Sequence, residues 1–264
     1  MEKINVIIND EKYDFDKGIT LFEISEKVYK EEFPALVAFV DNEIFSLDKK
    51  INYDCSVRFV NVLDPTGNRI YTRSLFFVLS YAFKELFGYD YYVKVCHSID
   101  KAIKLRTNLY LNQDRLNKLK DKMTEIIEND MHIEKCLVSR KEARKYFLSV
   151  NDKSKADTFI YNTNHYVTLY KLGDLYDYFF CNMPISTGVF KSFDLYFLDK
   201  GSFILQFPTV GDNGNIPEYV NREKIVKTFD DIYSLSKKLG LFDSADVNKA
   251  VASGKISDII KLTE

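Results

Sequence analysis

The segment 69–87 most constrains how this chain can fold, because it is the longest uninterrupted amphipathic stretch in the sequence. Its apolar residues recur at the 3.6-residue spacing of one helix face, and they are Leu75, Val78, Leu79, Ala82, Phe83 and Leu86. Thr72 or Ser74 can cap the start, and Gly88 follows the last periodic residue as a stop. We therefore predict a core helix over 69–87, around which the rest of the chain is organised.

Composition predicts a globular protein, since 46% of the 264 residues are hydrophobic and 29% are charged. The net charge of −2 argues against a uniformly basic surface but leaves room for a local basic patch. No apolar run reaches the ~18 residues of a membrane span, and no signal segment opens the chain. We expect a cytoplasmic protein with free thiols at four widely separated positions, Cys55, Cys96, Cys136 and Cys181.

Residues 1–63 have the element order of a β-grasp fold. Asn9-Asp10 separates two alternating runs, which predicts a β-hairpin. Thr20 and Glu23 have the capping-box spacing, which predicts a helix start. The expected elements are strands at 3–8 and 11–15, a helix at 21–33, and strands at 35–40 and 56–62.

A turn-forming joint at 64–68 is expected to lead into a second α+β unit. Ser139 and Glu142 repeat the capping-box spacing within it. The C-terminal part reads as helical, with two short helices split at Gly254. The expected strands lie at 89–100, 101–111, 132–139, 158–162, 165–173, 175–182, 193–198 and 202–207, and the expected helices at 111–130, 141–149 and from 221 onward.

Local phrases carry a resemblance to a known family. GITLFEIS before the first helix and ALVAFVDNEIFSLD after it look like a TGS domain, a β-grasp module that acts as an RNA-contacting or regulatory appendage. SLFFVLSYAFKELF and the run 116–147 are similar to the second N-terminal domain of threonyl-tRNA synthetase, whose fold is shared with the alanyl-tRNA synthetase editing domain. The resemblance implies two histidines on the first helix and a late C-x-x-x-H motif, which edit mischarged tRNA or hold zinc.

This chain departs from that pattern at three of the four positions. Arg73 and Phe77 stand where the helix histidines belong, Cys181 is kept, and Ile185 replaces the last histidine. Arginine stays protonated, and neither Phe nor Ile can ligate a metal or move a proton. We therefore expect a degenerate editing site with no catalytic residue, no metal and no cofactor.

The old cleft leaves two interpretations open. One is an aromatic pocket lined by Phe76, Phe77, Tyr81 and Phe180, in which Arg73 binds a carboxylate or phosphate. The other is a filled cavity, with Phe77 and Ile185 as packing residues and Arg73 at the surface. Cys181 has no base nearby in the sequence, so we interpret it as a small buried hydrophobe.

The last third adds a second resemblance. DLYFLDKGSFILQFP, then 218–241 and 247–262, look like the segment that precedes the kinase in bacterial nucleoside kinases of the uridine kinase type. The resemblance implies a TGS-like domain at 1–63, a synthetase-like domain at 68–208, and a helical segment at 209–264 leading toward a kinase domain. That kinase would be a partner in cis and would bring ATP and Mg²⁺, and none of its residues is present here.

The leading hypothesis is thus a non-catalytic ligand-binding or regulatory region of a uridine kinase-like protein, in which a small molecule binds the degenerate cleft. A second hypothesis is a module that binds the acceptor end of tRNA, supported by a basic, aromatic-bearing cluster at Arg140, Lys141, Arg144, Lys145 and Tyr146. A third is a residual aminoacyl-tRNA hydrolase that uses Cys181 or a bound water. The sequence leaves the ligand and the oligomeric state open.

Overall fold

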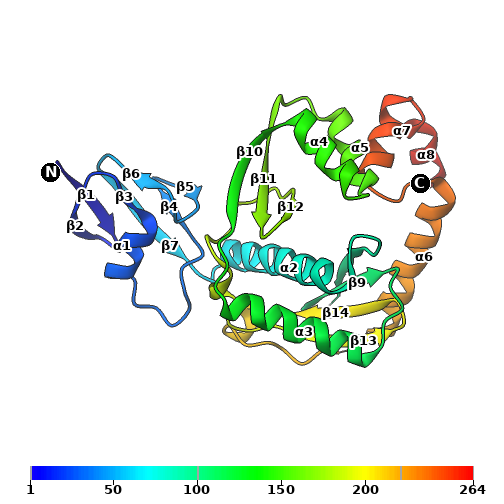
Figure 1. Cartoon of the computed structure of the whole chain (residues 1–264), viewed down its shortest axis with the longest axis horizontal. Coiled ribbons are helices and arrows are strands. Elements are labelled where there is room, and N and C mark those ends of the chain that lie inside the picture. The colour runs from blue at the N-terminus through cyan, green and yellow to red at the C-terminus, as the bar shows by residue number, and fades with distance from the viewer. Residues whose placement is uncertain (1, 100, 221, 264) are drawn as a thin grey trace. The chain divides into compact units, whose positions relative to one another are not determined.

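A computed structural model of the chain describes residues 2–99, 101–220 and 222–263 (Figure 1). It divides into two compact units, of which the first comprises 1–135 and 170–219 and the second 136–169 and 220–264. The chain is α+β, with a β-grasp module, an editing-like α+β part and C-terminal helices, which confirms the predicted fold class. The predicted domain limits at 63, 68 and 208 stay a prediction.

The β-grasp module opens the first unit. Its main sheet has the order β2-β1-β7-β4-β5, in which β1 and β7 are parallel and the other pairs are antiparallel. A short pair, β3 with β6, lies beside the start of α1. The elements are β1 (Lys3–Ile8), β2 (Glu11–Asp16), β3 (Ile19–Thr20), α1 (Leu21–Val28), β4 (Val37–Val40), β5 (Glu43–Phe45), β6 (Lys50–Ile51) and β7 (Cys55–Val60).

Local sequence accounts for these elements. Asn9 and Asp10 have φ of 50° and 65°, the left-handed pair of residues that a tight hairpin turn requires, so the predicted β1–β2 hairpin is confirmed. The capping box of Thr20 and Glu23 also forms as predicted. The helix ends at Val28, five residues before the predicted end at 33.

The rest of the first unit surrounds α2. A mixed helix-and-sheet layer forms as α3 packs beside α2 and the sheet β13-β14-β9-β8 contributes to the same core (Figure 1). The hairpin β11–β12 turns at Gly173, whose φ is +58°. The elements are α2 (Pro65–Phe87), β8 (Val93–Ile99), β9 (Ala102–Thr107), α3 (Gln113–Glu128), β12 (Leu175–Asp177), β13 (Asp194–Asp199) and β14 (Ser202–Gln206), with 3-10 turns at Thr187–Val189 and Val210–Asp212. Two further strands, β10 (Glu134–Ser139) and β11 (Tyr166–Leu172), run across the limits between the units.

The central helix begins earlier than predicted. Asp64 is the N-cap of α2, and its carboxylate accepts hydrogen bonds from the backbone N–H groups of Thr66 and Gly67. Pro65 occupies the first helical position, where its missing N–H has no cost. The predicted caps at Thr72 and Ser74 and the predicted joint at 64–68 were therefore wrong, while Gly88 ends the helix as expected.

The apolar stripes of α2 and α3 form most of the core. Leu75, Val78, Leu79, Ala82 and Phe83 of the predicted α2 stripe are buried, whereas Leu86 is partly exposed. On α3, the predicted stripe is buried at Leu116, Leu119, Met123 and Ile126. These residues pack with strand residues of β9 and β14. Residues of the segment 178–193, which carries Cys181, belong to the same core, so α2 and α3 hold that segment in place.

The second unit is helical where we expected a strand. The segment 158–162, predicted as a strand, lies in α5 (Lys153–Tyr161), because Asp152 caps that helix and Ala156 and Phe159 are buried three residues apart. The remaining helices follow the prediction, with Gly254 between the last two. They are α4 (Arg140–Ser149), α6 (Glu223–Leu239), α7 (Ser244–Ala252) and α8 (Ile256–Thr263). Across the described residues, no helix has the length and apolar character needed to cross a bilayer.

Candidate functional site

Arg73 and Cys181 lie together at the surface of the first unit. Arg73 is on the exposed side of α2, and its guanidinium is close enough to the Cys181 thiol to lower the pKa of that thiol. Cys181 is half-buried and packs against two hydrophobic clusters, the large core around α2 and α3 and a small cluster of Val37, Val60 and Ile70. Within the described residues no carboxylate pairs with Arg73, so its charge is available to an anion.

Phe77 and Ile185 pack in two different hydrophobic clusters, and the cluster that contains Phe77 is also contacted by Cys181. Phe77 is completely buried, with its ring in edge contact with Phe179 at a centroid distance of 5.3 Å. Ile185 packs against the β-grasp core. Phe77 therefore fills its position as a core residue, and Ile185 contributes to a different surface.

The thiol of Cys181 is in a poor environment for nucleophilic chemistry. Burial raises its pKa, and the neighbouring Arg73 charge lowers it only in part, so that the pKa stays above its ordinary value. A neutral thiol is a weak nucleophile. The pair therefore offers an anion contact rather than an activated sulfur.

Phe180 is the residue whose surroundings differ most from the predicted pocket. Its ring is 82% exposed, although we expected it to line an aromatic cleft, and it makes an edge contact with Tyr178 at 4.7 Å. Phe76 and Tyr81, the other expected lining residues, pack into the α2 core. An exposed phenyl ring next to Cys181 is a flat apolar face that no sequence pattern indicated.

The predicted basic cluster lies on α4 of the second unit. Lys141, Arg144 and Lys145 are exposed on the side opposite the buried Ala143 and Phe147, as their spacing of three and four residues requires. Arg140 differs, because its guanidinium donates a hydrogen bond to the backbone carbonyl of Asn162. Three cations of the predicted set thus share one solvent-facing side of the helix.

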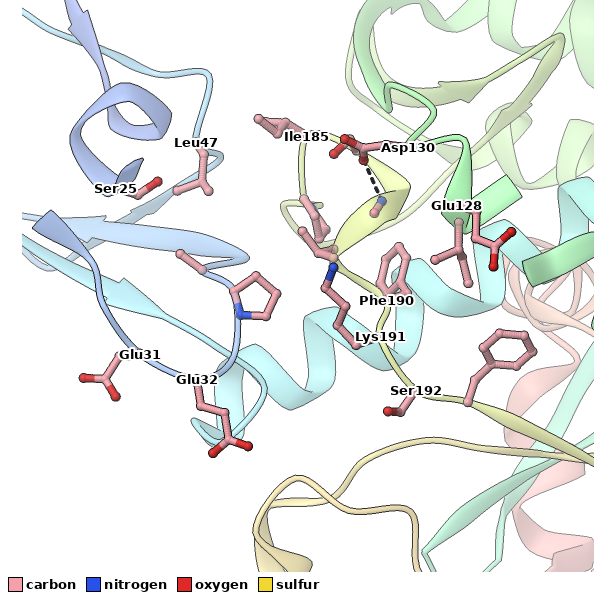
Figure 2. A pocket seen from close by; sticks show the side chains of 18 of the residues that line it. Ser25, Glu31, Glu32, Leu47, Glu128, Asp130, Ile185, Phe190, Lys191 and Ser192 are labelled. Atoms are coloured by element: carbon pink, nitrogen blue, oxygen red, sulfur yellow. Dashed lines mark hydrogen bonds between the residues drawn. The ribbon is translucent and has the colours of Figure 1, made fainter. Parts of the chain in front are cut away.

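A large groove also opens in the first unit, between α1 with the 29–35 segment and the end of α3 with the 184–193 segment (Figure 2). Its volume is about 1050 Å³. Ile185, Phe190 and Leu47 contribute to its apolar floor, and Glu31, Glu32 and Glu128 stand around it (Figure 2). Sequence reasoning missed this groove, because its walls come from segments about 100 residues apart.

The histidines occupy separate elements, and no group of three metal-ligating side chains occurs among residues 2–99, 101–220 and 222–263. His97 is in β8, His132 forms an isolated bridge with Ser186, and the carbonyl of His165 accepts from the N–H of Arg140.

Comparison with known proteins finds similarity to threonine–tRNA ligases. Threonine–tRNA ligase of Thermotoga petrophila is 29% identical over 200 residues, which cover 73% of this chain and 30% of the ligase. The chain is similar to threonyl-tRNA synthetases. The ligase of Halorhodospira halophila is 29% identical over 187 residues, or 69% of this chain, and that of Finegoldia magna is 26% identical over 248 residues, or 87%.

The match defines a threonyl-tRNA synthetase-like region, as the sequence resemblance predicted. The chain spans 29% to 38% of the length of these three synthetases. No family model matches it. Within the synthetase-like region, α2 carries Arg73 beside Cys181 of the 178–193 segment, and the same segment carries the exposed ring of Phe180.

Proposed function

We propose that this chain is a non-catalytic module that binds the acceptor end of tRNA. Two exposed side chains of the first unit carry the proposal. They are Arg73, a guanidinium with no carboxylate partner in the described residues, and Phe180, a ring exposed to 82% in the segment that also holds Cys181. An arginine contacts phosphate, and an exposed aromatic ring stacks on an unpaired base. The single-stranded 3′ end of a tRNA offers both groups. The similarity to threonine–tRNA ligases supports the same class of ligand.

The site also supports binding without hydrolysis. The buried ring of Phe77 fills its position in the core and carries no group that could move a proton. The raised pKa of the Cys181 thiol leaves the thiol protonated near neutral pH. We therefore expect the lifetime of an aminoacyl-tRNA to be the same with and without the protein. A shortened lifetime that is lost in Cys181→Ala would support the residual-hydrolase hypothesis instead.

The deciding experiment measures the affinity for tRNA with a complete 3′ end and for the same tRNA shortened by its last unpaired nucleotides. Stacking on an aromatic side chain is worth about 1–3 kcal/mol per base, so Phe180→Ala should weaken binding of the complete tRNA by roughly five- to 150-fold. The shortened tRNA should bind weakly and be insensitive to that change.

Tyr110→Ala is a matched control, because Tyr110 is another exposed aromatic side chain of the same unit and lies outside the β-grasp module. It should leave the affinity unchanged. Equal binding of the two tRNAs, or equal loss in Phe180→Ala and Tyr110→Ala, would contradict acceptor-end recognition.

The resemblance to uridine kinase-type proteins supports a second proposal, that this region regulates a kinase in cis by binding a small molecule at the degenerate cleft. Arg73 is the observation that favours it, since an exposed guanidinium can also contact a nucleotide phosphate. A thermal-shift screen separates the two proposals, because a ligand that binds only the folded state raises its apparent stability. A shift with uridine nucleotides that disappears in Arg73→Ala would support regulation, and uridine phosphorylation by this chain alone would contradict its non-catalytic part.

A further inference from the structure

The groove of the first unit has a chemistry that the proposed tRNA contacts do not use. The side chains that line it include five carboxylates and two lysines, so its net charge is three negative. The carboxylates are those of Glu26, Glu31, Glu32, Glu128 and Asp130. Such a surface repels the phosphates of a nucleic acid.

Most of that negative charge is not neutralised from within the chain. In the described residues, Glu31, Glu32 and Glu128 have no ion pair, and the carboxylate of Asp130 accepts the N–H of Gly188 at 2.7 Å. Of the two lysines, Lys120 is already paired with Asp194. The groove thus presents unpaired carboxylates, and an occupant would have to supply the cations that neutralise them.

The end of α3 strengthens the same preference. The last turn of α3 carries no basic residue, and Glu128 and Asp130 lie at and just beyond its C-terminus. The carbonyl groups at a helix C-terminus carry partial negative charge and favour a cation. Acidic side chains at this end add to the field instead of compensating it, so the end of the helix also favours a cationic ligand.

Between the carboxylates the groove is apolar. Phe22 of α1 is 43% exposed, and Ile127, Ile185 and Phe193 are half-buried in the opposite wall. An occupant that matches this surface carries apolar side chains for the floor and cations for the walls. A volume of about 1050 Å³ exceeds a typical drug-sized site and suits several residues of a peptide.

We propose that this groove binds a basic amphipathic peptide segment of a partner protein, in which leucine-like side chains alternate with lysine or arginine. The apolar side chains of the segment lie on the floor between α1 and the 184–193 segment. Its cations pair with carboxylates at the rim, which are Glu31 and Glu32 on one side and Glu128 at the end of α3. Charge complementarity selects this partner over an acidic or uncharged one.

The test uses a fluorescein-labelled 12-residue peptide of leucine and lysine, with binding to the full chain followed by anisotropy at low and at physiological salt. Two matched probes replace leucine with serine, or lysine with glutamate. The Leu/Lys probe should bind, and Glu31→Lys combined with Glu32→Lys should weaken it about tenfold, because each reversal replaces an attraction with a repulsion. Phe22→Ser should weaken it as well.

Asp14→Lys combined with Glu43→Lys is the control, since it makes the same change in net charge at exposed residues outside the groove. This variant should bind as the unmodified protein does, and circular dichroism should show that all variants are folded. Equal effects of the two double variants, or equal binding of the Ser/Lys and Leu/Lys probes, would overturn the proposal. The proposal would also be overturned if the protein did not bind the probe and instead self-associated through Glu31 and Glu32. Failure here leaves tRNA binding intact, because Arg73 and Phe180 do not line the groove.

Discussion

At the scale of single residues, the Arg73–Cys181 contact makes a prediction about thiol chemistry. Burial raises the pKa of Cys181 and the Arg73 charge lowers it, so removing that charge should raise the pKa further. Arg73→Met keeps most of the side-chain bulk and removes the charge. We expect the pH profile of Cys181 alkylation by iodoacetamide to shift to higher pH, with a slower rate at any pH below the pKa.

Peptide-level mass spectrometry would follow each cysteine separately. Cys96 lies in β8, away from Arg73 in the sequence, and its profile should not move. An unchanged or downward-shifted profile for Cys181 would show that the guanidinium does not act on the thiol.

The candidate site could be predicted only in part from residue types. The residue types at positions 73, 77 and 185 already predicted that these positions hold no metal, because Arg, Phe and Ile cannot ligate one. The exposure of Phe180 was not, since periodicity does not assign a direction to a side chain in an irregular segment. Ile185 packs against the β-grasp core instead of beside Cys181, which depends on tertiary contacts that one sequence does not specify.

At the scale of secondary-structure elements, the start of α2 makes a prediction about stability. A Cβ on Gly67 would lie 1.8 Å from the backbone carbonyl oxygen of Asn61. Gly→Ala inside a helix ordinarily stabilises by about 1 kcal/mol. At Gly67 we expect the opposite effect on stability. Gly67→Ala should lower the free energy of unfolding by about 1–3 kcal/mol, because the backbone must move to relieve the overlap.

Urea unfolding would measure the change. Gly211→Ala is the control, since a Cβ there meets no atom within 4 Å and the backbone is not left-handed. It should change the free energy of unfolding by less than about 0.5 kcal/mol. A neutral or stabilising Gly67→Ala would contradict the close approach of Gly67 to the Asn61 carbonyl.

Elements with strong local signals were predicted well. Both capping boxes, at Thr20 and Ser139, form as their spacing indicated. The start of α2 was missed because Asp64-Pro65 fits a turn as well as an N-cap followed by Pro at the first helical position. In α5, the residues Thr158 to Tyr161 favour strands individually, and burial three residues apart overrides that preference.

At the scale of the whole molecule, charge is nearly balanced overall but unevenly distributed. The net charge is −2, yet α4 presents three cations on one side and the groove carries five carboxylates. Binding of tRNA should therefore depend on local contacts. Replacing Lys141, Arg144 and Lys145 together by Gln should reduce the slope of log K against log salt by about 0.7–0.9 for each phosphate that the variant no longer neutralises.

Filter binding over a series of salt concentrations would give the slope. Lys12, Lys118 and Lys255 are exposed lysines outside the predicted cluster, and their joint replacement by Gln is the control for net charge. A slope that changes equally in both triple variants would show that α4 binds no phosphates of its own.

The pairing of strands far apart in sequence also determines when each part of this protein can fold during its synthesis. The β-grasp sheet is completed when β7 pairs in parallel with β1, so this module can close once about its first 60 residues are available. The hairpin β8–β9 has no such early partner, because β9 pairs on its other side with β14, from Ala102 with Gln206 to Arg106 with Ser202. While the residues between β9 and β14 are synthesised, the edge of β9 that later binds β14 is unpaired and can pair with a wrong strand. We expect a nascent chain to depend most on a chaperone during this interval.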